Sequence, residues 1–200
     1  AEYGRSLLDS PHKIVLAPTV NLPFGEGRHW LNHGGVVAAI IGGWSVNAAT
    51  TLQSGFPMGV SQQVLTTTSV LYGGATRPDL VAGVPIVLSD ITQRIQSSPT
   101  NNLYLNAAAF TTSAATTFGN EPRILPGVYS PWRNNTDLGI NKSVGLPWNT
   151  HAQFRIEVLN LFNQVEWAAP ASSFGSSSFG QITTQANNAR TIQFTVRYQF

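Results

Sequence analysis

The stretch that decides the fold is Thr191–Phe200, which reads T-I-Q-F-T-V-R-Y-Q-F. Apolar and polar side chains alternate strictly along it, which is the pattern of a β-strand with one apolar and one polar face. The apolar face is rich in aromatic residues and continues to Phe200, where a strand of a soluble sandwich rarely carries an aromatic side chain. The stretch therefore favours a strand with one long apolar belt over a strand of a paired core. The apolar members are Ile192, Phe194, Val196, Tyr198 and Phe200.

Four earlier segments show the same alternation. A short turn at Pro147–Thr150 joins two of them, so these two are expected to form a hairpin. The first segment contains Pro18, which cannot donate to a strand ladder, so we expect a bulge or an early strand end there. The predicted strands lie near residues 13–22, 44–53, 137–146, 152–162 and 191–200.

The composition fits a surface that is apolar on one side and wet on the other. Charged residues make up only 10% of the chain, against roughly 25% in an average soluble domain. No run of about 18 apolar residues is present, so no transmembrane helix is predicted. A barrel strand crosses a bilayer with only about 9–11 residues, half of them apolar, so the modest hydropathy does not exclude a membrane protein.

The connections between the predicted strands alternate in length. Residues 56–133 and 164–189 form very long connections, whereas residues 147–150 and 24–43 form shorter ones. Compact soluble domains rarely contain such long loops, but outer-membrane barrels have short periplasmic turns and long extracellular loops. If Phe200 lies on the periplasmic side, both long loops fall outside. We therefore expect an all-β fold, a partial antiparallel transmembrane β-barrel.

The aromatic residues agree with this topology. Six of them would lie near the two membrane interfaces, where barrels carry aromatic girdles. Lys142 interrupts the apolar face of its strand, and near a strand end its amino group is expected to extend to the interface. The expected girdle residues are Trp44, Trp148, Tyr198 and Phe200 on the periplasmic side and Phe162 and Trp167 on the outer side.

Several motifs resemble, in order and over most of the chain, the Oar-like TonB-dependent transporters. Two of them are G-G-W-S-V-N-A-A-T-T-L-Q-S-G-F-P and F-R-I-E-V-L-N-L-F-N. Each motif is weak alone, and their ordered set is fairly specific. The motifs span Ser10–Gly25, Gly42–Pro57, Tyr104–Phe110, Phe118–Val128, Asn135–Lys142, Phe154–Asn163 and Ser173–Arg190.

The resemblance implies a 22-stranded barrel in a Gram-negative bacterium, of which this chain is the last five strands. It implies a plug and often a carboxypeptidase-regulatory-like domain upstream, and energised import across the outer membrane. The expected partners are the lipid bilayer, the barrel-assembly machinery, TonB through the upstream plug and an unidentified extracellular substrate. Because Ala1–Arg5 does not begin a signal peptide, we expect Ala1 to be a cut end.

Two groups of residues are candidates for function within the barrel. The first is a signal read by the barrel-assembly machinery on the closing strand, and the second is a polar wall facing the lumen. The assembly residues are Phe194, Val196, Tyr198 and Phe200, and the lumen-facing residues are Arg155, Glu157, Gln193 and Arg197.

The sequence does not support nucleic-acid binding, a metal site or catalysis. The net charge is +2 without a basic cluster, which argues against nucleic-acid binding, and no cysteine is available for a disulfide or a thiolate site. His29 and His33 are spaced four apart, but Gly34 and Gly35 disfavour a helix, so exposed turn histidines are the simpler interpretation. No G-x-S-x-G motif or acid–base pair is evident. We therefore expect no catalytic, cofactor-binding or metal-binding residue and no enzymatic activity.

Two alternatives stay open at this point. A soluble secreted β-sandwich that serves binding or adhesion would pair its apolar faces in a core. An outer-membrane barrel without a transport role would lack a plug and a TonB box upstream. For the barrel itself, five strands cannot close a ring, since even the smallest use eight. The sheet is therefore expected to be open, and the isolated chain to be unstable in water.

Overall fold

The computed structural model describes residues 4–25, 27–32, 35–63, 76–88, 102–148 and 150–200. The chain divides into two compact units, which we call the sheet unit and the loop unit. The sheet unit comprises Lys13–Leu52, Asn134–Val165 and Asn187–Phe200, and the loop unit comprises Ala1–His12, Gln53–Arg133 and Glu166–Ala186.

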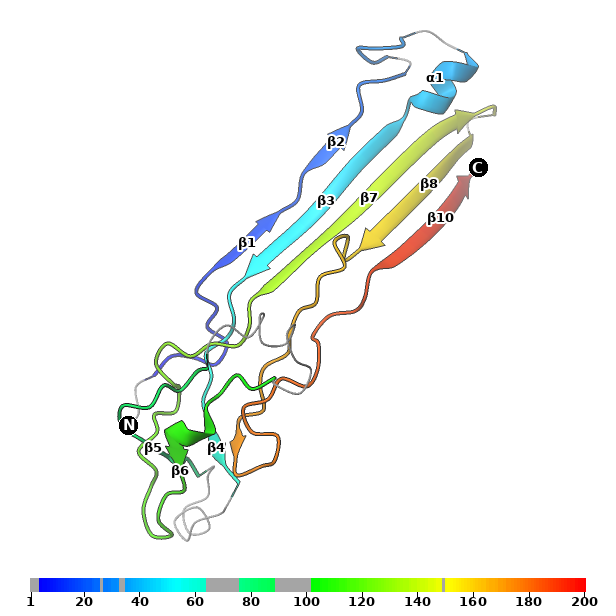
Figure 1. The fold of residues 1–200 in the computed structure, drawn as a ribbon. Helices are drawn as coiled ribbons and strands as arrows, with labels where there is room; N and C mark the ends of the chain where they lie inside the picture. The colour runs from blue at the N-terminus through cyan, green and yellow to red at the C-terminus, as the bar shows by residue number, and fades with distance from the viewer. Residues whose placement is uncertain (1–3, 26, 33–34, 64–75, 89–101, 149) are drawn as a thin grey trace. The chain divides into compact units, whose positions relative to one another are not determined.

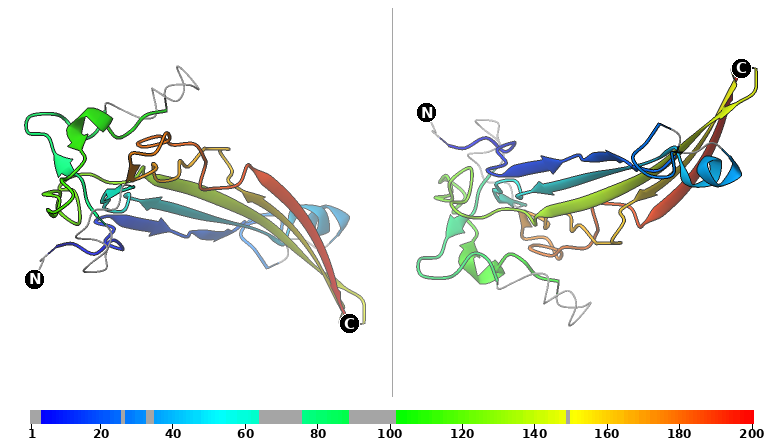
Figure 2. Two further views of the ribbon diagram at one scale, coloured as in Figure 1. Left: turned by 90° about the horizontal axis from the view of Figure 1, so that it is seen from below. Right: turned by 90° about the horizontal axis from the view of Figure 1, so that it is seen from above.

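The sheet unit is a curved, open sheet (Figures 1 and 2). Its strands follow the order β1-β3-β7-β8-β10, and β2 also pairs with β3. The prediction of an antiparallel all-β architecture with an unclosed sheet is confirmed. The strands are β1 (Lys13–Leu16), β2 (Thr19–Asn21), β3 (Trp44–Gln53), β7 (Arg133–Leu146), β8 (Thr150–Leu159) and β10 (Thr191–Gln199).

The register brings the apolar positions of neighbouring strands into rows. Ile156 of β8 lies opposite Ile140 of β7 on one side and opposite Phe194 of β10 on the other. Because side chains of paired residues point to the same face, each strand adds its apolar residues to one common surface. The neighbouring rows are Leu138–Val158–Ile192, Lys142–Phe154–Val196 and Val144–Ala152–Tyr198.

The structure corrects three of the expected strands. The strand expected at 137–146 begins four residues earlier, at Arg133. The single strand expected at 13–22 is two short strands, because Pro18 has no N–H and instead accepts a bond of 3.0 Å from the Ala48 N–H. The strand expected at 152–162 ends at Leu159, because Asn160 adopts a left-handed conformation (φ 53°). The Asn160 side chain bonds the Gln164 backbone and the Asn188 carbonyl oxygen, which fixes the chain reversal.

A short helix, α1 (Val36–Ile41), lies in the connection at 24–43, where the sequence pattern predicts none. It begins after Gly35 and ends before Gly42. No helix among the described residues is long and apolar enough to cross a membrane.

The loop unit has a hydrophobic core of its own. The long connections treated as separate loops, 56–133 and 164–189, both contribute to it, and the rings of Phe110, Phe174 and Phe179 pack at centroid distances of 5.3–5.9 Å. The unit contains β4 (Ser61–Gln62) paired with β9 (Ser173–Phe174), β5 (Asp79–Leu80) paired with β6 (Phe110–Thr111), and the 3-10 helix η1 (Ala107–Ala109). The buried core residues are Met58, Val60, Leu105, Ala109, Phe110, Leu125, Val128 and Phe179.

Candidate functional site

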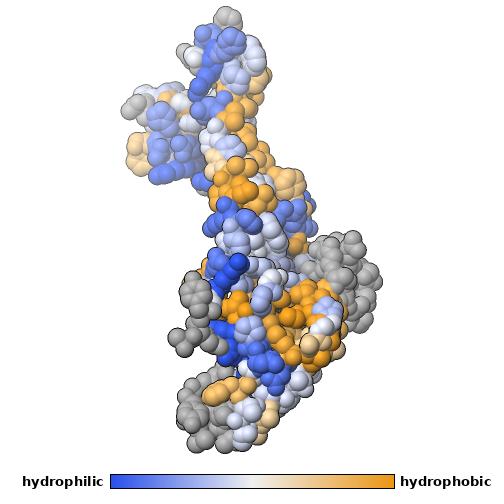
Figure 3. Space-filling view, turned by 90° about the vertical axis from the view of Figure 1, so that its left-hand side faces the viewer, coloured by the Kyte–Doolittle hydropathy of each residue, from blue (hydrophilic) through white to orange (hydrophobic). Residues whose placement is uncertain are grey.

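One face of the sheet is apolar and open. Phe194 and Val196 keep 75% and 70% of their surface exposed, although each lies opposite an apolar residue of β8. Figure 3 displays another side of the molecule, where further broad hydrophobic patches are open on the surface. An exposed apolar side chain such as Phe194 or Val196 loses roughly 1.5–3 kcal/mol of transfer free energy when it stays in water. The apolar face of the sheet therefore requires an apolar environment.

The opposite face of the sheet is polar. Arg155 Nη2 donates to Glu157 Oε1 at 2.6 Å, and Asn141 Nδ2 donates to Asn47 Oδ1 at 2.9 Å. The register places Gln193 opposite Glu157. The Arg155–Glu157 pair is partly exposed, so its contribution to stability is small, at most about 1 kcal/mol.

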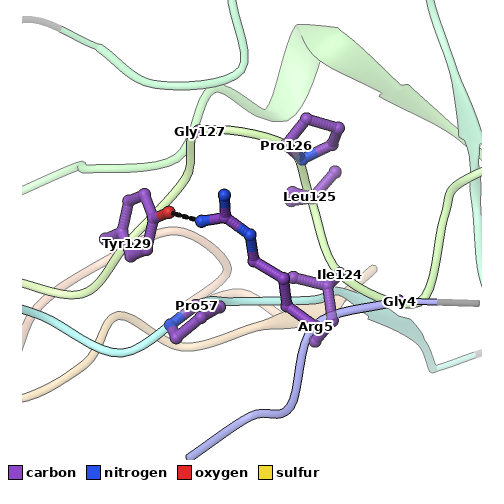
Figure 4. Close-up of a pocket in the computed structure, with 8 residues that line it drawn as sticks. All are labelled: Gly4, Arg5, Pro57, Ile124, Leu125, Pro126, Gly127 and Tyr129. Carbon is purple, nitrogen blue, oxygen red and sulfur yellow. Dashed lines mark hydrogen bonds between the residues drawn. The ribbon is translucent and has the colours of Figure 1, made fainter. Parts of the chain in front are cut away.

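A cavity of about 330 Å³ opens in the loop unit (Figure 4). The Arg5 guanidinium points into it and donates a short hydrogen bond to the Tyr129 hydroxyl group. Tyr104 supports this region, because its hydroxyl group donates a hydrogen bond to the Tyr129 carbonyl oxygen at 2.5 Å. Burial also raises the pKa of Tyr104. Apolar residues complete the walls, so the cavity combines one cation and one phenol with a hydrophobic lining. The other lining residues are Gly4, Pro57, Ile124, Leu125, Pro126 and Gly127.

An open apolar face of this kind is explained by the family to which the chain belongs. The family model described as an outer membrane beta barrel domain matches residues 1–193. The chain belongs to this family of outer-membrane β-barrel domains. No curated protein and no solved structure matches this chain.

As an outer-membrane barrel domain, the chain has its place in the outer membrane, and the prediction of that location is confirmed. Lipid-facing residues of such barrels are apolar, and the inner wall is polar. The apolar face of β7, β8 and β10 is therefore the outer surface of the barrel wall. A soluble sandwich would pair this face with a second sheet, whereas Phe194 and Val196 are exposed.

The four expected assembly residues lie on β10 or directly after it. Phe194, Val196 and Tyr198 lie on the apolar face of β10, and Phe200 follows the strand fully exposed. The Tyr198 and Phe200 rings lie 6.1 Å apart. The expected lumen residues also share a face, opposite to this one. The register pairs Gln193 with Glu157 and Arg197 with Gln153, and Arg155 with Thr195.

The loop unit of the barrel domain contains a buried carboxyl group that the sequence pattern does not predict. Glu121 is 1% exposed, and its Oε1 accepts a 2.9 Å bond from the Val60 N–H. Burial raises the pKa of Glu121 to about 7, although the Val60 N–H and the Arg77 charge both act to lower it. Glu121 Oε2 is buried without a hydrogen-bond partner in the part of the chain that the structure describes. Glu121 lies within the Phe118–Val128 motif, but nothing in the sequence pattern indicates that its carboxyl group is buried, so only the folded chain identifies it.

The expected turn histidines fall partly within the structure. His29 is exposed, and its ring contacts that of Trp30 at a centroid distance of 5.4 Å. His33 lies outside the described residues. Within the described ranges, no group of three His, Cys, Asp or Glu residues could hold a metal ion.

Proposed function

We propose that this barrel domain is the C-terminal wall of a TonB-dependent transporter of the Oar-like kind, which imports a substrate across the outer membrane. The observation that carries the proposal is the loop unit. Both long connections leave the sheet at the end opposite the β7–β8 turn, and they share one hydrophobic core. A folded outer assembly of this size favours a receptor over a simple structural wall, because binding residues concentrate on loops held by a rigid scaffold.

The polar face of the sheet supports the same proposal. Arg155, Glu157, Gln193 and Arg197 would line the lumen on the substrate side of the wall, next to an upstream plug. The cavity at Arg5 and Tyr129 would offer an incoming substrate a cation and a phenol. We further propose that the chain contributes no catalytic step, and that the barrel-assembly machinery reads its closing strand.

The test uses the whole protein purified in detergent and the isolated C-terminal domain of TonB. The proposal expects a plug and a TonB box upstream of Ala1 and measurable binding of the TonB domain by biolayer interferometry. Deleting the TonB box should abolish that binding without changing the heat-modifiable migration that reports a folded barrel. The matched control is an equally long deletion in another upstream linker.

The alternative is an outer-membrane barrel without a transport role. It predicts a folded whole protein that has no plug and does not bind the TonB domain. That result would overturn the transport proposal and leave the barrel assignment intact.

A further inference from the structure

The helix α1 exposes apolar residues in an unusual way. All six residues of Val36–Ile41 are apolar, none is buried, and Val36 and Ile40 expose 76% and 62% of their surface. The small residues Ala38 and Ala39 line the hollow next to the end of β7, whereas none of the large β-branched residues of the helix lines it. A helix of a soluble protein has the reverse arrangement, with its large apolar residues toward the core.

Two side chains of the sheet hold this helix by its C-terminal carbonyl groups. The Lys142 amino group donates to the carbonyl oxygens of Ala39, Ile40 and Gly42 at 2.7–2.8 Å. The indole N–H of Trp44 donates to the Ile40 carbonyl oxygen at 3.0 Å, and the Lys142 amino group lies 4.9 Å from the Trp44 ring centroid. A cation at the negative end of a helix dipole stabilises a helix that six residues alone could not sustain.

A close contact between two glycines lies at the C-terminal end of the helix. A Cβ added at Gly42 would lie 2.6 Å from the Ala38 carbonyl oxygen and 2.8 Å from the Gly25 Cα atom. The connection before the helix therefore packs directly against its end, and the helix is held in place rather than tethered loosely.

The attachment points show which face of the sheet carries the helix. Lys142 pairs with Phe154, and it shares the apolar face of β7 with Ile140 and Val144. Trp44 begins β3 and lies next to Lys142 on the same face. The helix therefore continues the apolar outer surface of the barrel at the end of the sheet where the β7–β8 turn lies (Figure 1). In outer-membrane barrels short turns of this kind face the periplasm.

We propose that α1 is an interfacial anchor that inserts its apolar side chains among the phospholipids of the periplasmic leaflet, with Lys142 as the residue that positions it. Three features favour lipid over a protein occupant. The helix is continuous with the lipid-facing wall, residues 35–44 carry no charge, and the nearby cation is occupied by three carbonyl oxygens. Tryptophan beside an apolar helix is also typical of the membrane interface. The inserting residues are Val36, Val37, Ile40 and Ile41.

The proposal is tested in the whole protein, reconstituted into phosphatidylethanolamine–phosphatidylglycerol vesicles. These 200 residues contain no cysteine, so a nitroxide label at Val37→Cys reports one position once any upstream cysteines are replaced by serine. Power-saturation electron paramagnetic resonance then compares its collisions with oxygen and with a water-soluble nickel chelate. The references are Phe194→Cys on the apolar face of β10 and Thr116→Cys at an exposed turn of the loop unit.

We expect the Val37 label to fall between the two references, with higher oxygen and lower nickel accessibility than the Thr116 label and a shallower position than the Phe194 label. A label as accessible to nickel as the Thr116 label would place the helix in water and overturn the proposal. A label protected from both reagents would overturn it in favour of a protein occupant, either the plug or a second copy of the chain.

Lys142→Met tests the positioning role separately. It removes three hydrogen bonds, so the Val37 label should become more mobile and more accessible to nickel, whereas Lys13→Met on β1 should change neither quantity. An unchanged label would overturn the role of Lys142. If Lys142→Met does not yield a folded, heat-modifiable barrel, Lys142→Gln removes the cation with a polar side chain in its place and gives the same readout.

Discussion

Glu121 Oε1 accepts a hydrogen bond of 2.9 Å from the Val60 N–H in the interior of the loop unit. Burial raises the pKa of Glu121 from 4.5 to about 7, so the folded chain keeps this proton to a higher pH than the unfolded chain does. The stability contributed by the protonated form is complete below pH 4.5 and is lost as the pH rises toward and through 7. The loss amounts to roughly 3 kcal/mol.

We therefore predict that the loop unit of the whole protein is better protected at pH 5 than at pH 8. Glu121→Gln should abolish this difference, because the amide oxygen still accepts from Val60 and no proton is exchanged. Hydrogen–deuterium exchange, corrected for intrinsic rates, measures the protection of residues 57–62. Asp79→Asn is the control and should keep the pH dependence, since Glu121 is intact. Equal dependence in Glu121→Gln would contradict the role of this carboxyl group.

Leu105 is fully buried in the core of the loop unit. Leu105→Ala should destabilise this unit by about 2–5 kcal/mol, because it removes packing and leaves a cavity. Limited proteolysis of whole cells should then cut the loops faster, whereas the barrel keeps its heat-modifiable migration. Leu8→Ala, at an exposed residue of the same unit, should leave the cleavage rate unchanged. Loss of the barrel band in Leu105→Ala would mean that the loop unit is required for barrel assembly.

Phe194 and Thr195 are neighbours on opposite faces of β10. Phe194→Arg should cost about 2–4 kcal/mol if the residue lies near the bilayer midplane, because the arginine side chain would face hydrocarbon. Thr195→Arg places the same side chain on the polar face and should cost much less. Urea unfolding of the whole protein in vesicles compares the two variants. Similar losses of stability in both would contradict the assignment of the two faces.

Phe200 is fully exposed after β10, and its ring lies 6.1 Å from that of Tyr198. If the assembly machinery reads this end of the chain, deleting Phe200 should lower the level of the whole protein in the outer membrane. Immunoblotting of outer-membrane fractions measures this level, and Gln199→Ala on the opposite face is the control. An unchanged level after the deletion would refute the hypothesis.

The strands of the sheet could be predicted from the sequence. The range 44–53 expected for a strand coincides with β3, because alternation along one segment already determines which face each side chain occupies. Pro18 also marked the interruption between β1 and β2, because the missing N–H is a local property.

The helix α1 and the core of the loop unit could not be predicted from local sequence patterns. The Val- and Ile-rich segment of α1 favours a strand by propensity, and it is helical beside Lys142, about one hundred residues away in the sequence. The loop core joins Leu105, Leu125 and Phe179 from separate segments without a common period. The two faces of the wall followed from local pattern, whereas Glu121 and the Arg5 cavity depend on long-range packing.

The antiparallel ladders of β7, β8 and β10 carry a consequence for any complete ring. Each strand runs opposite to its neighbour, so the strand that meets the free edge of β10 must rise from the end where the β7–β8 turn lies. A ring in which every neighbour alternates in direction can hold only an even count of strands. Twenty-two satisfies this arithmetic, and an odd total would require one parallel seam.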